Sequence, residues 1–320
     1  MPYIENSTYE APAAFHNAHA QTCYPALFRV VTGVHYERER IHTPDQDFID
    51  LDWSRVSSSN NLAVICHGLE ADSQSTYIKG IVKAFNKKGW SSVIFNFRGC
   101  SGEANLLLKS YHSGATEDLD LILRHIAGQK KYDQITLVGF SLGGNVMLKF
   151  LGDGKFSSVS LITGAAAVSV PCHLKSSVLR LAEKSNLIYM RRFLKKLNPK
   201  IRNKIHLMPG AKYEDFLAAR NFLDFDNLYT APVHGFKDAD DYYEKCSARQ
   251  FLGNIKIPTL LINAWDDPFL AKECFPVEEA QKNPFFTLET PQHGGHVGFV
   301  TFHSDGEYWH EKRVTAFIIE

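Results

Sequence analysis

No stretch of the sequence approaches the roughly 20 consecutive apolar residues that a membrane-spanning helix requires. The start of the chain has no basic segment followed by an apolar one, so we predict no signal peptide. The six cysteines are scattered without CxxC spacing, a pattern typical of reduced thiols in a chain of this length. We therefore expect a cytoplasmic protein.

Nucleotide-binding patterns are also missing. The chain contains neither the phosphate-binding pattern G-x-x-x-x-G-K followed by Ser or Thr, nor G-x-G-x-x-G after a strand-like run. Lys plus Arg and Asp plus Glu number 35 each, so the net charge is zero. We expect no organic cofactor, no metal and no nucleic-acid partner.

The most informative stretch that is present is Gly139-Phe140-Ser141-Leu142-Gly143. It follows a strand-like apolar run, 134–138, and precedes a helix-like run, 145–151. Strand, G-x-S-x-G and helix together form the context of a nucleophile elbow, whose turn projects the serine hydroxyl above the sheet. Glycines at 139 and 143 would avoid side-chain clashes in such a turn. An ordinary glycine-rich turn is the alternative.

A base and an acid are available further along the chain. The apolar run 257–263 predicts a buried parallel strand that ends just before Asp266 and Asp267. The next predicted strand, 285–289, leads to His293 and His296. Ser, Asp, His is the chain order of α/β-hydrolases. The pattern alone does not choose within either pair, and no further ligands at zinc-site spacing accompany the histidines.

Two backbone N–H groups are expected to bind the oxyanion. One belongs to Leu142, the residue after the serine, and the other to Leu69, in the loop 67–70 that follows the predicted strand 61–66. Gly68 would allow the substrate to approach the backbone closely. We expect His67 to have a structural role.

Motifs spread over nearly the whole chain carry a family resemblance. They include His19-Ala20-Gln21-Thr22, Asn96-Phe97-Arg98-Gly99, Tyr111-His112-Ser113-Gly114, Asp241-Tyr242-Tyr243 and the stretch from His293 to Phe299. With them the sequence resembles the YheT-like α/β-hydrolases, which are related to plant embryogenesis-associated proteins and mammalian α/β-hydrolase domain-containing lipid esterases. The resemblance implies a triad of Ser141, Asp267 and His296.

The remaining pattern predicts an α/β-hydrolase fold. A hairpin at 34–53 should precede alternating elements: strands 62–66, 91–97, 134–139 and 159–162, helices 76–88, 116–128 and 142–151, and a final helix near 306–319. The alternation stops between 170 and 250, which is too long for a loop. We predict a core of 1–169 and 251–320, including an N-terminal arm, with a helical cap insertion at 170–250.

The first half of the predicted cap is strongly basic. Its ten Lys and Arg residues are opposed by Glu183 alone: Lys175, Arg180, Lys184, Arg191, Arg192, Lys195, Lys196, Lys200, Arg202 and Lys204. A basic amphipathic helix can lie on an anionic membrane. Alternatively, the basic face is solvated and the apolar face packs on the core, and we favour this second interpretation.

The sequence therefore predicts a serine hydrolase acting on carboxylic esters through an acyl-enzyme. The resemblance and the apolar side of the cap favour a lipid or other apolar acyl ester as substrate. A thioesterase, a peripheral membrane phospholipase, and a non-catalytic binding protein on a hydrolase fold are the alternatives.

Overall fold

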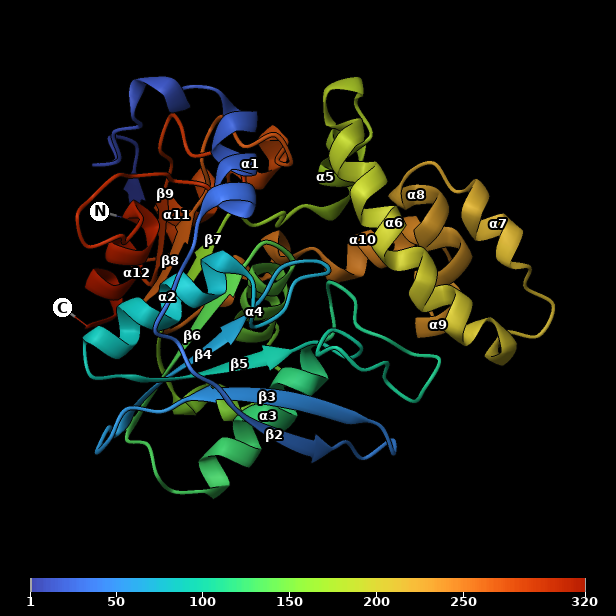
Figure 1. The fold of residues 1–320 in the computed structure, drawn as a ribbon, viewed down its shortest axis with the longest axis horizontal. Helices are drawn as coiled ribbons and strands as arrows, with labels where there is room; N and C mark the ends of the chain where they lie inside the picture. Colours follow the sequence, from blue (N-terminus) through green and yellow to red (C-terminus); the bar gives the residue numbers. More distant parts are fainter. Residues whose placement is uncertain (1, 320) are drawn as a thin grey trace.

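The computed structural model describes residues 2–319, and a nine-stranded sheet crosses its centre (Figure 1). The strand order is β1-β9-β8-β7-β6-β4-β5-β3-β2. Only the pairs β2–β3 and β3–β5 are antiparallel; the other neighbours run parallel. The strands are β1 (Tyr3–Ile4), β2 (Glu37–His42), β3 (Phe48–Ser54), β4 (Asn61–Cys66), β5 (Ser91–Asn96), β6 (Gln134–Phe140), β7 (Ile162–Val168), β8 (Thr259–Ile262) and β9 (Phe286–Glu289).

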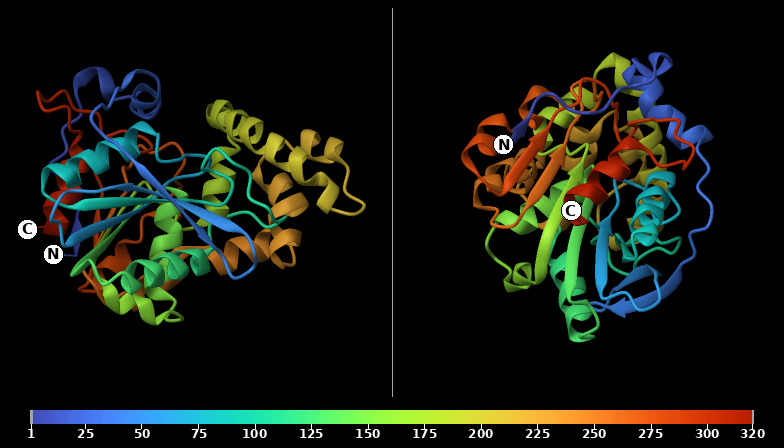
Figure 2. Two further views of the ribbon diagram at one scale, coloured as in Figure 1. Left: turned by 60° about the horizontal axis from the view of Figure 1, so that its bottom comes forward. Right: turned by 90° about the vertical axis from the view of Figure 1, so that its left-hand side faces the viewer.

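Helices cover both faces of the sheet (Figure 2). The central strands are buried on both sides and read as continuous apolar runs, as parallel strands do when helices cover them. On one face the core is formed with α2 (Thr76–Lys87) and α12 (Trp309–Ile319). On the other it is formed with α3 (Thr116–Gly128), α4 (Leu142–Gly152) and α11 (Val277–Lys282). The predicted α/β-hydrolase fold is confirmed.

One predicted strand is wrong. Residues 159–162 were expected to form it, but Ser157–Leu161 is a short 3₁₀ helix and β7 begins at Ile162. β7 contains Gly164 and three consecutive alanines, residue types that are depleted in strands. The larger apolar residues just before them therefore led to a strand prediction that lies too early in the chain. The strand lies between β6 and β8, where small side chains let α4 and α12 pack closely against it.

The chain between β7 and β8 is helical and lies next to the sheet, at the carboxyl ends of its parallel strands (Figure 1). Its helices are α5 (Leu174–Leu181), α6 (Leu187–Lys204), α7 (Tyr213–Ala218), α8 (Phe222–Phe225), α9 (Ala231–His234) and α10 (Ala239–Cys246). They enclose an apolar cluster of their own that includes Met190, Phe216 and Phe225. The exact division into core and cap stays a prediction.

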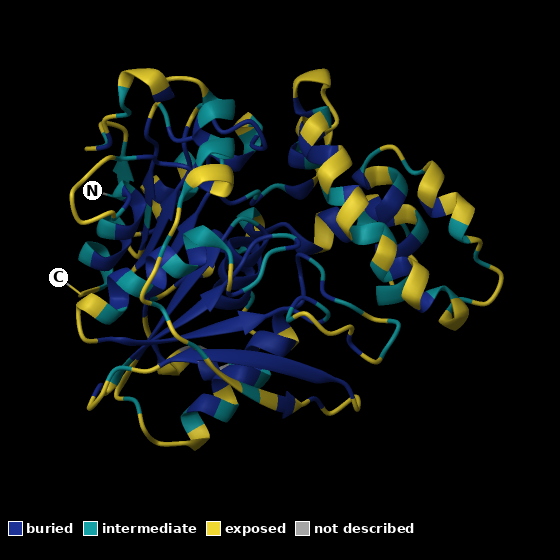
Figure 3. Ribbon diagram, in the orientation of Figure 1, coloured by how far each residue is buried: buried dark blue, intermediate teal, exposed yellow. Residues whose placement is uncertain are grey.

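The N-terminal arm contributes to both layers. β1 extends the sheet beyond β9, and α1 (Ala18–Phe28) packs beside α2. Exposed residues are concentrated on the outer faces of the helices, whereas the central strands are buried over most of their length (Figure 3). Within residues 2–319, no helix combines the length and the apolar character that crossing a membrane would require.

Candidate active site

Ser141 lies at the sharp turn between β6 and α4. Its backbone has φ 51° and ψ −121°, a conformation that residues other than glycine rarely adopt. The Ser141 N–H donates to the carbonyl of Val168 on the neighbouring strand at 2.9 Å, which fixes the turn. Such strain persists only where the surroundings enforce it, as at a nucleophile elbow.

The two glycines of the motif are required by close backbone contacts. A Cβ at Gly143 would lie 2.4 Å from the carbonyl oxygen of His67, and one at Gly139 would lie 2.6 Å from the Cα of Gly144. Real Cβ atoms do not approach so closely. A larger residue at either position would therefore push α4 away from β4 or β6.

The structure brings Ser141, His296 and Asp267 together at one edge of the sheet. The Oγ of Ser141 is 3.0 Å from Nε2 of His296, and Nδ1 of that ring is 2.9 Å from Oδ2 of Asp267. The Asp267 side chain is fully buried and that of His296 is 10% exposed. Asp267 also accepts the N–H of Phe269, whose ring stacks on His296 with centroids 4.1 Å apart.

The competing residues Asp266 and His293 form a separate pair. Nδ1 of His293 is 3.3 Å from Oδ2 of Asp266, and the His293 side chain is 37% exposed. Oδ1 of Asp266 accepts the N–H of Gly295 at 2.9 Å, and burial raises the pKa of this carboxyl. Neither residue has a hydrogen bond to Ser141. The pair instead ties the loop after β8 to the loop that carries His296.

Helix α1 holds the histidine loop from the other side, a role that the residue patterns alone did not predict. The Thr22 hydroxyl accepts the His296 N–H at 2.9 Å. Gln21 is fully buried, and its Oε1 accepts the N–H of Val300 at 2.9 Å. Glycine at 298 is needed because a Cβ there would lie 2.4 Å from the Gln21 carbonyl. The signal for this contact was the motif His19 to Thr22.

The loop after β4 faces the serine. Gly68 fits so closely that an added Cβ would lie 3.3 Å from the Cβ of Ser141. The neighbouring N–H groups of Leu69 and Leu142 donate to no other residue within 2–319. Both residues line the same cavity as Ser141 and His296. Two unpaired amides beside a serine hydroxyl have the composition of an oxyanion hole.

His67 supports this loop from beneath. The side chain is fully buried, and its Nδ1 lies 2.7 Å from the carbonyl oxygen of Gly68. Its Nε2 accepts the N–H of Phe97 at 3.1 Å, which leaves Nδ1 as the donor. Burial lowers the pKa of His67 to about 4, so the ring is neutral at pH 7.

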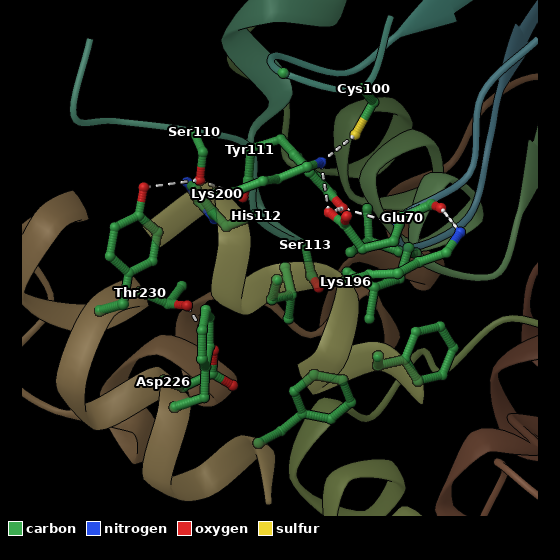
Figure 4. Close-up of a pocket in the computed structure, with 18 of the residues that line it drawn as sticks. Glu70, Cys100, Ser110, Tyr111, His112, Ser113, Lys196, Lys200, Asp226 and Thr230 are labelled. Carbon is green, nitrogen blue, oxygen red and sulfur yellow. Dashed lines mark hydrogen bonds and ion pairs between the residues drawn. The ribbon is translucent and has the colours of Figure 1, made fainter. Parts of the chain in front are cut away.

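Ser141 lines a cavity of about 510 Å³. Figure 4 shows part of the lining of this cavity. Ser141, Leu69, Leu142 and His296 line this cavity, and half of its lining residues belong to the helical segment. Apolar wall residues are Leu174, Val178, Leu181, Phe193, Leu197, Phe222 and Phe225. Polar groups gather where Figure 4 shows Lys196 and Lys200 beside Glu70. Among residues 2–319, no group of three or more His, Cys, Asp or Glu side chains is placed to hold a metal ion.

Comparison with known proteins agrees with this architecture. The family described as alpha/beta hydrolase fold matches residues 62–302. The YheT protein of Escherichia coli strain K12 is 37% identical over 292 residues, which cover 89% of this chain and 85% of YheT. Phospholipase ABHD3 of Mus musculus is 29% identical, over 83% of this chain and 67% of that protein.

Among solved structures, esterase Pf2001 of Pyrococcus furiosus superposes with a TM-score of 0.59 at 19% identity, covering 90% of this chain and 95% of that one. At this identity the likeness concerns the fold alone. The family match over 62–302 includes the turn at Ser141 and the loop that carries His296. The chain therefore belongs to the α/β-hydrolase fold family, in the group that includes YheT.

Proposed function

We propose that this protein is a serine hydrolase that cleaves carboxylic esters. The observation that carries the proposal is the hydrogen-bonded chain from Ser141 Oγ through His296 to Asp267, at a strained strand-to-helix turn. A hydroxyl is a weak nucleophile unless a neighbouring base takes its proton, and an acid that orients the base completes the set.

The proposed reaction has two halves. In the first, His296 Nε2 takes the proton of Ser141 as Oγ attacks the ester carbonyl, and Asp267 stabilises the resulting imidazolium. The amides of Leu69 and Leu142 hold the oxyanion. His296 then gives its proton to the leaving alkoxide. In the second half, water replaces the alcohol, with His296 again as base, and the acyl-enzyme is hydrolysed.

The apolar lining of the cavity favours a substrate whose acyl chain is apolar and binds there. The cavity walls above Ser141 are mostly aliphatic and aromatic, and burying such surface stabilises a bound acyl chain by about 0.8 kcal/mol per CH₂. The relative ABHD3 is named a phospholipase, which supports a lipid ester as the substrate class. The proposed mechanism uses no metal and no organic cofactor.

A peripheral membrane phospholipase is the second candidate. The side chains of Arg191, Arg192 and Lys195 on α6 are exposed beside Ile188, which is 71% exposed. A thioester substrate would use the same site and mechanism. A non-catalytic binding protein would need none of the hydrogen bonds from Ser141 to Asp267.

Labelling with a fluorophosphonate tests the proposal directly, because the probe reacts only with an activated serine. We expect the wild type to be labelled and Ser141→Ala not to be labelled. The variant's kcat should be about 10⁴- to 10⁶-fold lower, because triad members act as a unit. Esters of graded acyl length would then define the chain-length preference. Wild-type turnover at about a tenth or more of its rate in the alanine variant would reject Ser141 as nucleophile.

A further inference from the structure

The residue after Leu69 has an unusual backbone conformation. Glu70 has φ 52°, in the left-handed region of backbone conformation, which residues other than glycine rarely adopt unless their surroundings impose it. It directly follows the amide proposed to bind the oxyanion. Contacts that hold Glu70 therefore fix the chain on the C-terminal side of Leu69, and with it the position of the Leu69 N–H.

Part of the support comes from the core. The Glu70 N–H donates to the hydroxyl of Tyr111 at 2.9 Å, and that hydroxyl donates back to Oε1 of Glu70 at 2.7 Å. Tyr111 is itself buried and stacks on Phe97 with ring centroids 5.0 Å apart. This reciprocal pair fixes one side of the loop.

The other part comes from α6, in the helical segment. Nζ of Lys200 donates to Oε1 of Glu70 at 2.8 Å, and Nζ of Lys196, one turn earlier, donates to the Glu70 carbonyl at 2.8 Å (Figure 4). Two successive turns of one helix thus bind the side chain and the backbone of the same residue. Charged donors make hydrogen bonds roughly twice as strong as neutral ones.

The carboxylate of the Lys200–Glu70 pair is buried. The Glu70 side chain is 4% exposed and that of Lys200 is 33% exposed. Lys200 also donates to Sγ of Cys100 at 3.3 Å, where burial raises the thiol pKa to about 11 and keeps it neutral. Removing the ammonium would leave a buried carboxylate without its cation, which destabilises the conformation that buries it.

We infer that Lys196 and Lys200 are positioning residues, which hold the loop of Leu69 in its oxyanion-binding conformation and so make that site depend on the seating of α6. The inference rests on the proposed function. The oxyanion forms only after attack, so the contribution of the Leu69 N–H appears in the transition state and not in substrate binding.

The test compares Lys200→Met and Lys196→Met with Arg202→Met, whose exposed side chain lies on the same helix and does not line the cavity. A short, uncharged soluble ester is the substrate, and an alkylboronic acid, which forms a tetrahedral adduct with an active serine, is the probe. We expect Lys200→Met to lower kcat by about 10- to 100-fold and to weaken the boronic acid similarly, with KM nearly unchanged. Lys196→Met should have a smaller effect, Arg202→Met none, and Lys200→Arg should retain most activity.

Glu70→Gln gives a second measurement if Lys200→Met does not fold, as judged by circular dichroism. If the two residues act through each other, the double variant should be no slower than the slower single variant. Unchanged kcat and boronic acid affinity in Lys200→Met would overturn the inference. So would a rise in KM with kcat unchanged, because the lysines would then bind substrate. An active Ser141→Ala protein would reject the proposed function itself, a result that the lysine variants cannot produce.

Discussion

At the scale of residues, the two histidine–aspartate pairs differ in what they can reach. His296 spans Ser141 and Asp267, whereas His293 contacts Asp266 and stacks on His16 with ring centroids 4.7 Å apart. A general base must lie within hydrogen-bond distance of the proton that it removes, and within 2–319 only His296 lies so placed next to Ser141.

This difference predicts unequal effects of substitution. His296→Ala and Asp267→Asn should lower kcat/KM by about 10³-fold or more, because each interrupts the triad. His293→Ala and Asp266→Asn should lower it by roughly 10-fold at most, since they only loosen the supporting loop. Steady-state kinetics on the four folded proteins provides the measurement. A larger loss in either member of the second pair would reassign that role.

Buried histidines make stability depend on pH. His67 and His310 are fully buried, and burial lowers their pKa values to about 4 and about 3. The unfolded chain takes up these protons near pH 6.5, whereas the folded chain does not. The two histidines therefore do not lower the free energy of unfolding above that pH, and they lower it as the pH falls below. Each histidine contributes at most about 1.4 kcal/mol per pH unit. Asp226, whose pKa burial raises to about 6, opposes part of this loss.

His310→Phe isolates one of these groups. Neither ring nitrogen has a hydrogen-bond partner within the described chain, and the ring lies among Phe140, Phe299 and Tyr308. We expect a free energy of unfolding that is about 1–3 kcal/mol higher near pH 5 and less sensitive to pH. Urea unfolding near pH 7 and near pH 5 measures this. The exposed His303→Gln is the control, and an equal pH dependence in all three proteins would contradict the assignment.

At the scale of elements, α6 presents two different faces. Tyr189, Met190 and Leu194 are buried against the apolar cluster of the helical segment, as expected of an amphipathic helix. Arg191, Arg192 and Lys195 are exposed and have no ion pair with any residue in 2–319. The apolar face thus packs mainly within the helical segment, with Phe269 beside it, whereas packing on the core was expected. Whether the basic face binds membrane stays a prediction.

Vesicle co-sedimentation decides between the two interpretations of this face. If it binds membrane, wild type should pellet with anionic vesicles at low salt and be released at high salt, since the screening length falls from about 10 Å at 0.1 M to about 3 Å at 1 M. Replacing Arg191, Arg192 and Lys195 by Gln should abolish binding, because each contributes about 1 kcal/mol. Replacing Lys88, Lys130 and Lys131, also exposed, is the matched control. Equal, negligible pelleting everywhere would leave a solvated face.

Most elements of the sheet could be predicted, for an identifiable reason. β4 and β6 are mostly apolar and are bounded by turn residues, so their sequences alone indicate buried strands. β7 could not be predicted, because its glycine and alanines are selected by helices that only the folded protein brings near. The support of His296 by Thr22 joins residues 274 positions apart, which no local pattern reports.

At the scale of the whole molecule, the chain leaves the sheet after β7 and returns at β8, which are neighbours. The two ends of the excursion are joined directly: the Arg249 N–H donates to the Cys172 carbonyl at 2.9 Å, and the Leu174 N–H donates to the Ser247 hydroxyl at 3.0 Å. The parallel strands around the gap pair with each other and close the sheet without help from the intervening helices.

This arrangement has an evolutionary consequence. A segment whose two ends meet side by side can be lengthened, shortened or exchanged by recombination in a single genetic event, and no other part of the chain has to be rerouted. Related proteins can therefore acquire new substrate ranges while inheriting the same sheet and elbow. If Lys196 and Lys200 hold Glu70 as inferred, the exchange is not free, because each incoming segment must bring its own means of supporting that loop. Variation in the helical segment would then be limited by the need to support Glu70.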